Sequence, residues 1–132
     1  VGSEMCIRDR YVTLVEPRLT RVSFLRPLVR TLTLGGVAIH AKRLEEVPNL
    51  SSGSFSHITC RAVTELGPFL DMVVGFSGSG AQLVCMKGPR WSEELQESGD
   101  VLERSGYVTG KIVKHVLPRS GVQRTLLIFD EK

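Results

Sequence analysis

Short apolar runs alternate with longer amphipathic stretches along the chain. β-branched and apolar runs predict six strands, at residues 11–16, 37–41, 55–62, 81–87, 107–117 and 124–130. Apolar residues at helical spacing predict three helices, at residues 19–34, 64–74 and 91–105. Polar, glycine-containing stretches predict loops at residues 48–54 and 76–80. Strands that alternate with helices are typical of an α/β protein with a mostly parallel sheet.

Proline and glycine refine this pattern. Pro27 falls inside the first helix, where we expect a kink or a broken turn. Gly35-Gly36 is predicted to end that helix. Pro68 is expected in the first turn of the second helix, where proline is tolerated. A Pro/Gly/Ser loop at residues 118–121 joins the last two strands, so these strands are predicted to pair antiparallel.

Composition places the chain among ordinary globular proteins. Its 132 residues suffice for one small domain, and its hydrophobic fraction is 42%. The sequence has no apolar run of about 20 residues and no signal-peptide pattern, so a cytoplasmic protein is expected. The net charge of +3 permits a nucleic-acid partner without requiring one. Neither a CxxC pair nor histidines at ligand spacing occur, so no metal is predicted, and Cys60 and Cys85 are expected to be buried strand thiols.

The first ten residues, VGSEMCIRDR, stand apart from this pattern. They resemble the translation of a transposon-based sequencing-library adapter. We therefore expect residues 1–10 to be non-native and residues 11–132 to be the genuine part of the chain. On this interpretation the gene begins upstream of Tyr11 and Cys6 has no function.

Two segments that follow early strands are candidates for nucleoside binding. Glu16 ends the first strand, where a carboxylate can bind ribose hydroxyls in nucleotide-binding sheets; a solvated glutamate before Pro17 is the alternative. Residues 43–46 (RLEE) follow the next strand, where a short turn can contact an adenine ring through its backbone. A charged helix start is the alternative for this segment.

Two basic residues end later strands. Arg61 closes the strand at the predicted switch point of the sheet, where a guanidinium can bind a cofactor carboxylate or an RNA phosphate. A surface ion pair is the alternative. Lys87 ends the following strand and would either face the substrate or lie at a solvated strand end.

Taken together, five stretches closely resemble the RsmG family, formerly called glucose-inhibited division protein B: LVEPRLTRVSFLRPLVR, AKRLEEV, FSHITCRAVTEL, AQLVCMKG and LPRSGVQRTLLIFDEK. The resemblance implies an S-adenosylmethionine-dependent methyltransferase that modifies guanine N7 at position 527 of 16S rRNA. It also implies a partial class I (Rossmann-like) fold, in which a mostly parallel sheet ends in an antiparallel pair and the first strand is missing.

The resemblance also implies the site. Cofactor binding would involve four residues: Glu16 near the ribose, Leu44 and Glu45 beside the adenine, and Arg61 at the methionine end. Arg61 would also lie close to the target base and is the candidate catalytic residue. Three basic residues are expected on the RNA or active-site face: Arg43, Lys87 and Arg124. We expect Glu16, Glu45 and Arg61 to gather on one rim.

The sequence departs from the family in several places. The glycine-rich cofactor loop and the N-terminal helices of the family are absent, Cys60 replaces the usual Ser, and Ser56 replaces Asp. The chain alone is therefore expected to bind cofactor poorly and to be inactive. Its expected partner is 16S rRNA in the small ribosomal subunit, with no membrane and no metal, and the protein is expected to be a monomer.

Two other functions remain open. A dehydrogenase fragment would use Glu16 to bind the ribose of NAD, although an antiparallel closing pair is unusual in that class. A non-catalytic RNA-binding module of similar fold is the second alternative.

Overall fold

The computed structural model describes residues 11–47, 55–61, 65–73 and 80–132. The chain forms two compact units, Val1–Leu50 and Ser51–Lys132, which are described separately below (unit 1 and unit 2). The segment 1–10 and the loop predicted at 48–54 lie outside the described residues, as does most of the loop predicted at 76–80. Among the described residues, no helix has the length and apolar character needed to cross a membrane.

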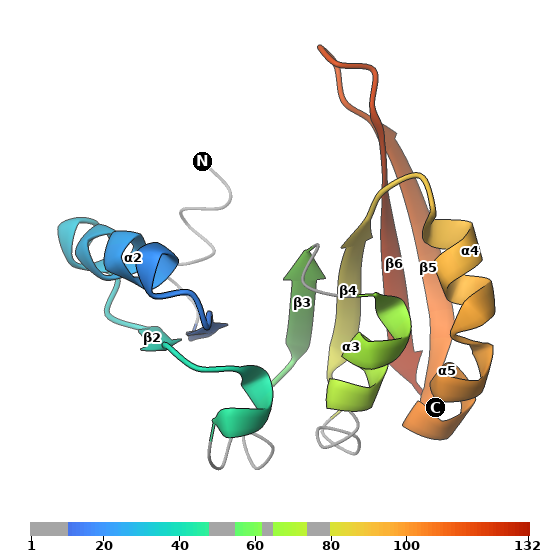
Figure 1. Cartoon of the computed structure of the whole chain (residues 1–132), viewed down its shortest axis with the longest axis horizontal. Coiled ribbons are helices and arrows are strands. Elements are labelled where there is room, and N and C mark those ends of the chain that lie inside the picture. The colour runs from blue at the N-terminus through green and yellow to red at the C-terminus, as the bar shows by residue number, and fades with distance from the viewer. Residues whose placement is uncertain (1–10, 48–54, 62–64, 74–79) are drawn as a thin grey trace. The chain divides into compact units, whose positions relative to one another are not determined.

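Unit 1 is a β-α-β arrangement followed by one short turn of helix (Figure 1). Strand β1 (Val12–Val15) leads into helix α2 (Leu19–Thr31), which returns the chain to strand β2 (Val37–His40). The strands are parallel, with Val12 opposite Val37 and Val15 opposite His40. The 3-10 helix η1 (Leu44–Glu46) follows. The order and type of the predicted elements are confirmed in this unit.

Helix α2 ends earlier than Gly35-Gly36 indicated. The helix stops at Thr31, and Thr33 takes a left-handed conformation with φ of 54°. The N–H of Leu34 bonds to the carbonyl of Val29 at 3.0 Å, and that of Thr33 bonds to Arg30 at 3.2 Å. This is the Schellman cap, in which the left-handed position usually holds glycine. Of the two outcomes expected at Pro27, the broken turn is wrong, because α2 runs through that residue without interruption, and the kink stays a prediction.

Unit 2 is a mixed sheet covered by helices (Figure 1). Its strands are β3 (His57–Arg61), β4 (Gln82–Lys87), β5 (Tyr107–Val116) and β6 (Gln123–Glu131), in the spatial order β3-β4-β6-β5. The β3–β4 pair is parallel, whereas β4–β6 and β5–β6 are antiparallel. The predicted antiparallel closing pair is therefore confirmed. The described strands form two sheets rather than one, with β1 paired to β2 and β3 paired to β4.

The core of unit 2 lies between the sheet and its helices. Helix α3 (Leu66–Val73) has Pro68 in its first turn, as predicted. It shares the core with apolar side chains from alternate positions of the strands, and the buried set comprises Leu66, Phe69, Leu70, Val73, Ala81, Leu83, Cys85, Tyr107, Leu127 and Phe129. Complete burial of one such Leu or Phe side chain stabilises a fold by about 1.5–3 kcal/mol. This packing fixes the sheet that carries the candidate residues of unit 2.

The helix predicted at residues 91–105 is two helices, α4 (Trp91–Glu97) and α5 (Gly99–Ser105). At the junction, Ser98 leaves helical geometry with ψ of 9°, and its Oγ donates to the carbonyl of Glu94 at 2.6 Å. A serine hydroxyl that bonds back to the preceding turn bends a helix, and glycine at the next position is a weak helix former. Apolar periodicity alone could not reveal this break.

The β5–β6 hairpin extends beyond the rest of unit 2 (Figure 1). Its turn is closed by the N–H of Leu117 bonding to the carbonyl of Val122 at 2.9 Å, and Gly121 supplies a left-handed conformation with φ of 68°. A register shift between Thr109 and Lys111 places a bulge at Gly110. Bulges bend a strand and increase its twist locally.

Candidate functional site

In unit 1, the candidate residues emerge from one edge of the two-stranded sheet. The strands are parallel and Val15 lies opposite His40, so the residues that follow both strands leave at the same edge. The N–H of Glu16 extends the pairing by donating to the carbonyl of His40 at 3.0 Å. Glu16 and the turn that holds Arg43 and Leu44 are therefore neighbours at the carboxyl edge, where α/β sheets bind ligands.

The carboxylate of Glu16 is directed toward the start of α2. Its Oε1 accepts the N–H of Arg18 at 3.0 Å, and its Oε2 lies 3.5 Å from Nη1 of Arg21. The side chain is 20% exposed, and both the ribose role and the alternative of a solvated glutamate before Pro17 stay predictions. A carboxylate has about four lone-pair positions, so these two contacts leave capacity for ribose hydroxyls.

The RLEE segment forms the single turn of η1. The N–H of Glu46 donates to the carbonyl of Arg43 at 3.0 Å, and the Glu46 carboxylate accepts the N–H of Arg43 at 3.2 Å. Leu44 is half-buried and Arg43 is exposed. The turn thus carries a half-buried apolar residue a few positions after the carboxyl end of β2. The roles of Leu44 and Glu45 stay predictions.

In unit 2, three basic residues reach one edge of the sheet. Arg61 ends β3 and lies opposite Met86, one residue before Lys87 at the end of β4. The antiparallel strand β6 starts at this edge, and its Thr125 pairs with Lys87. The guanidinium of Arg124 lies beside the turn after β4, since a Cβ built on Gly88 would be 3.9 Å from its Nη1.

These basic residues do not share one face of the sheet. Cys60 is half-buried on the helix-covered face, and the exposed side chain of Arg61 points to the other face because strand side chains alternate. Arg124 likewise precedes the buried Thr125 and is exposed. Arg61 and Arg124 are therefore accessible at the carboxyl edge of β3 and β4. Whether the edges of the two units form one rim stays a prediction.

Lys87 does not lie at a solvated strand end, which was one of the two alternatives predicted for it. It is only 6% exposed, and its Nζ lies 2.9 Å from Oε2 of Glu94 on α4. No well-aligned hydrogen bond reaches that oxygen among the described residues, so charge attraction holds the pair. The prediction of a solvated strand end is wrong, because Lys87 faces α4 and forms an ion pair between the sheet and that helix. Its assignment to the RNA or active-site face stays a prediction.

Glu94 was missed by the sequence analysis. It lies seven residues after Lys87 on a helix whose other acidic residue in the first turn, Glu93, pairs with Arg90 at 3.0 Å. Only the contact with Lys87 of β4 separates the half-buried Glu94 from the exposed Glu93. The sequence did contain one signal for Glu94: it lies at helical spacing from Trp91 and next to Leu95, two apolar residues that the structure half-buries.

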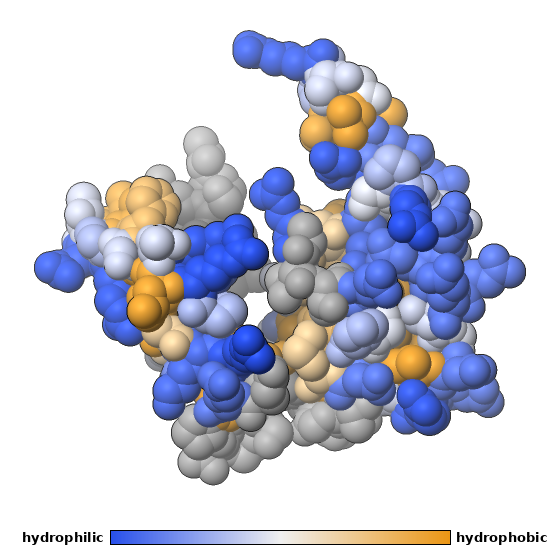
Figure 2. Space-filling model, viewed as in Figure 1, coloured by the Kyte–Doolittle hydropathy of each residue, from blue (hydrophilic) through white to orange (hydrophobic). Residues whose placement is uncertain are grey.

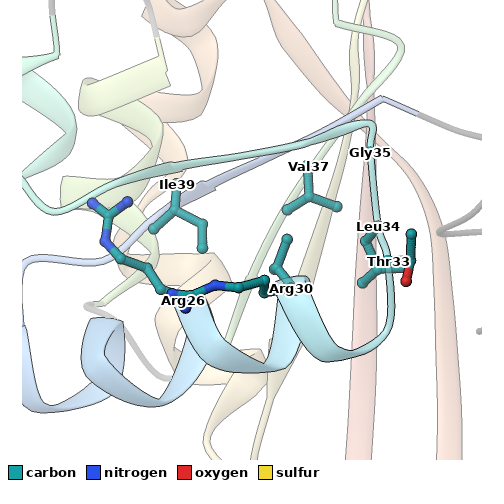
Figure 3. Close-up of a pocket in the computed structure, with 8 residues that line it drawn as sticks. Arg26, Arg30, Thr33, Leu34, Gly35, Val37 and Ile39 are labelled. Carbon is teal, nitrogen blue, oxygen red and sulfur yellow. The ribbon is translucent and has the colours of Figure 1, made fainter.

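A groove of about 480 Å³ lies between α2 and β2 in unit 1 (Figure 3). Apolar side chains and two arginines, Arg26 and Arg30, line it, but none of the predicted site residues does. Val22 is the buried residue of α2 among those described, while Phe24 is 66% exposed. The groove therefore reflects sparse packing of α2, and we assign it no function. Within the described residues, no cluster of three or more His, Cys, Asp or Glu side chains could hold a metal ion.

Solved structures with similar coordinates show the fold to which the described elements belong. The chain superposes on an rRNA methylase from Streptococcus thermophilus with a TM-score of 0.65 at 7% identity, covering 90% of this chain and 72% of that one. It also superposes on M. jannaschii TYW2 in complex with AdoMet with a TM-score of 0.64 at 13% identity, covering 91% and 57%. The described elements are therefore those of a Rossmann-like methyltransferase fold, as the sequence indicated.

The chain belongs to the family of rRNA small subunit methyltransferase G, also called GidB, whose model matches residues 4–126. Ribosomal RNA small subunit methyltransferase G of Desulfotalea psychrophila is 46% identical over 92% of this chain and 56% of its own length. The protein of the same name from Syntrophotalea carbinolica is 31% identical over 85% and 52%. The chain thus spans about half the length of these relatives. The family match begins within residues 1–10, whose adapter origin stays a prediction.

Proposed function

We propose that residues 11–132 are the C-terminal part of the catalytic domain of an enzyme that methylates guanine N7 at position 527 of 16S rRNA, with S-adenosylmethionine as methyl donor. One observation carries the proposal. The candidate cofactor and RNA residues lie at the carboxyl ends of parallel strands or at the start of the strand antiparallel to them. That edge is where α/β sheets bind their ligands.

The residues of unit 1 fit the nucleoside part of this cofactor. Glu16 is held by Arg18 and Arg21 and keeps free acceptor capacity for two ribose hydroxyls. Leu44 offers a half-buried apolar side chain to one side of an adenine ring. Both residues leave the same edge of the β1–β2 sheet, so one nucleoside can contact both.

Methylation at guanine N7 does not require acid–base catalysis by the protein. N7 carries an in-plane lone pair and has no proton to lose, so no general base is needed. S-adenosylmethionine supplies an electrophilic methyl group when bound. The chain must orient the base and place charge around it. The basic residues at the edge of unit 2, without an acid–base pair among them, are consistent with this demand.

Arg61 is proposed to bind the methionine carboxylate of the cofactor. Its guanidinium is exposed at the end of β3 and can form a bidentate pair with a carboxylate. Positive charge passes from the sulfonium to the base as the methyl group moves. A guanidinium in direct contact with the base would oppose that step, whereas one bound to the carboxylate would position the donor beside the base.

The β5–β6 hairpin is proposed to contact rRNA phosphates. Residues 111–129 contain no Asp or Glu, and their four basic residues are Lys111, Lys114, Arg119 and Arg124. Figure 2 shows hydrophilic and hydrophobic surface mixed along the hairpin, and Ile112 and Val116 are among its exposed apolar residues. Lys114 lies over the Trp91 ring, 5.3 Å from its centroid, so Arg119 at the turn is the better probe of RNA contact.

A chimera tests this function. Residues 12–132 would replace the matching half of the Desulfotalea psychrophila relative, which is 46% identical over the shared region. The chimera would be produced in bacteria that lack their own family member, and methylation of 16S rRNA would be mapped by chemical cleavage at N7-methylguanine followed by primer extension. We expect methylation at position 527.

Variants of the chimera test the assigned roles. Arg61→Ala should lower kcat/KM by about 100-fold, because a charge-assisted pair to the donor is lost. Arg119→Glu should raise the KM for RNA and weaken the dependence of binding on salt, with donor binding unchanged. Arg104→Ala is the matched control, since that exposed arginine on α5 pairs with Asp71 at 3.7 Å, away from the edge.

Two outcomes would reject the proposal. A folded chimera that binds S-adenosylmethionine but methylates a different base would refute the assigned substrate. A folded chimera that binds 16S rRNA without binding the donor would support the non-catalytic RNA-binding module instead.

A further inference from the structure

Two cysteines face each other across neighbouring strands of unit 2. Cys60 of β3 and Cys85 of β4 are register partners in the parallel pair. Directly paired strands are about 4.8 Å apart, which lies within the roughly 4.4–6.8 Å between Cα atoms of disulfide-bonded cysteines. Both side chains point to the face that the helices cover, because Cys60 and Cys85 occupy the more buried positions of their strands.

The two thiols are in contact and differ in accessibility. Cys60 is half-buried on a strand with one paired neighbour among the described strands, and Cys85 is completely buried. The thiol of Cys85 donates a hydrogen bond to the sulfur of Cys60, which lowers the pKa of Cys60 and raises that of Cys85. Desolvation raises the pKa of both thiols. The Lys87 ammonium lowers the pKa of Cys60, and the Glu94 carboxylate raises it. Because a reagent can reach the half-buried Cys60 but not the buried Cys85, Cys60 is the nucleophile and Cys85 the resolving thiol.

We propose that Cys60 and Cys85 form a reactive dithiol that a small-molecule disulfide converts to an intrachain disulfide. The Cys60 thiolate attacks one sulfur of the reagent, forms a mixed disulfide and releases the other half of the reagent as a thiolate. Cys85 loses its proton to that thiolate and attacks the sulfur of Cys60, releasing the second half. Two protein thiols are oxidised, and one reagent disulfide is reduced to two thiols.

The site does not depend on the proposed methyltransferase function. It follows from the register of β3 and β4, and it includes Lys87 and its partner Glu94. Lys87 lies two residues after Cys85 on the same face, and its charge lowers the pKa of Cys60 while that of Glu94 raises it. The disulfide would join β3 to β4 one residue before Arg61.

The test uses the 132-residue chain with Cys6→Ser, so that only one intrachain disulfide is possible. The native chain would be incubated with oxidised glutathione, and its free thiols and intact mass would be measured over time. We expect both thiols to disappear together, with the loss of two hydrogens from the mass and no bound glutathione at the end. A chain that keeps both thiols until it is denatured would overturn the proposal.

Single variants separate the two roles. Cys85→Ser should stop at a stable adduct of one glutathione, because the resolving thiol is gone. Cys60→Ser should react at least about tenfold more slowly, because the remaining thiol is buried and its pKa is raised. Circular dichroism checks that each variant is folded, and Cys85→Ala replaces Cys85→Ser if the serine is not tolerated. Equal adduct formation by the two single variants would also overturn the proposal.

Discussion

Single residues in unit 2 show how burial acts on polar atoms. The hydroxyl of Tyr107 is buried and has no hydrogen-bond partner among the described residues. Desolvation raises the pKa of Tyr107, and the nearby charge of Glu131 raises it further. A buried hydroxyl without a partner costs stability, whereas the aromatic ring that carries it contributes through its apolar area. The ring and the hydroxyl of Tyr107 thus have opposite effects on stability.

Replacing Tyr107 with phenylalanine should separate these effects. We expect Tyr107→Phe to raise the free energy of unfolding by about 0.5–1 kcal/mol at pH 7, because the unpaired hydroxyl no longer needs desolvation. In the parent chain the folded pKa exceeds the unfolded value of about 10. The folded state therefore favours the protonated tyrosine over the ionised one. The stability that this preference contributes is fully present below about pH 10 and is lost as pH rises through the folded pKa.

Urea unfolding at pH 7 and across the alkaline range would measure both effects. The variant should lose less stability than the parent as pH rises above about 10. Tyr11→Phe is the control, since Tyr11 is 97% exposed and should change neither quantity. A Tyr107→Phe chain destabilised by more than about 1 kcal/mol would mean that the hydroxyl is hydrogen-bonded.

The positions of some single residues could be predicted from the sequence, whereas their contacts with distant residues could not. Glu16 and Arg61 could be placed at strand ends from local apolar runs, and the structure puts them there. The burial of Lys87 could not be predicted, because its partner Glu94 belongs to a different element. The contact between Cys60 and Cys85 needed the register of two strands that are far apart in sequence.

At the scale of elements, strands and helices were predictable in kind but not in their ends. Hydrophobic periodicity detects the face that is buried, and a local hydrogen bond decides where an element stops. Thr33, rather than a glycine, closes α2, and Ser98 divides the predicted helix at residues 91–105. The bulge at Gly110 had no periodic signal either, since one extra residue in a ten-residue strand changes little in the pattern.

Gly110 provides a test of that bulge. A Cβ at this position would overlap Oδ2 of Asp130 and lie 3.4 Å from the carbonyl oxygen of Ile128. Asp130 could rotate away only by losing the hydrogen bond that Nε2 of Gln82 donates to its Oδ1 at 2.8 Å. Because this rotation loses one hydrogen bond, we expect Gly110→Ala to lower the free energy of unfolding by about 0.5–1.5 kcal/mol, measured by urea denaturation.

A double-mutant cycle identifies the cause of that loss. Asp130→Ala removes the carboxylate that the new methyl group would meet, so Gly110→Ala should cost less in that background than alone. Gly99→Ala is a useful comparison, because a Cβ there has no heavy atom within 4 Å. Equal costs in the two backgrounds would place the strain in the backbone of the bulge rather than at Asp130.

At the scale of the whole molecule, buried apolar side chains are divided unevenly between the two units. Within the described part of unit 1, the buried apolar residues are Val22 and Val47, and its sheet has two strands. The described part of unit 2 buries a larger set of side chains on a four-stranded sheet and on helices α3 and α5. A two-stranded sheet is marginally stable by itself. The sequence analysis predicted one sheet whose first strand is missing. A local pattern of apolar residues cannot show which strands pair with one another when they are far apart in the sequence.

Hydrogen exchange should reveal this difference in the 132-residue chain. Amides of β4 and β6 are expected to exchange only through opening of unit 2 as a whole, because these strands carry the buried Leu83 and Leu127. Amides of β1 and β2 should exchange at least about 100-fold faster, since their hydrogen bonds are covered by little apolar surface. The measurement is peptide-resolved exchange by mass spectrometry at neutral pH.

Leu83→Ala should accelerate exchange in β4 and β6 and leave β1 and β2 unchanged, because opening of unit 1 does not depend on that core. Protection of β1 equal to that of β4 would contradict this division, and would mean that β1 has a stabilising neighbour besides β2.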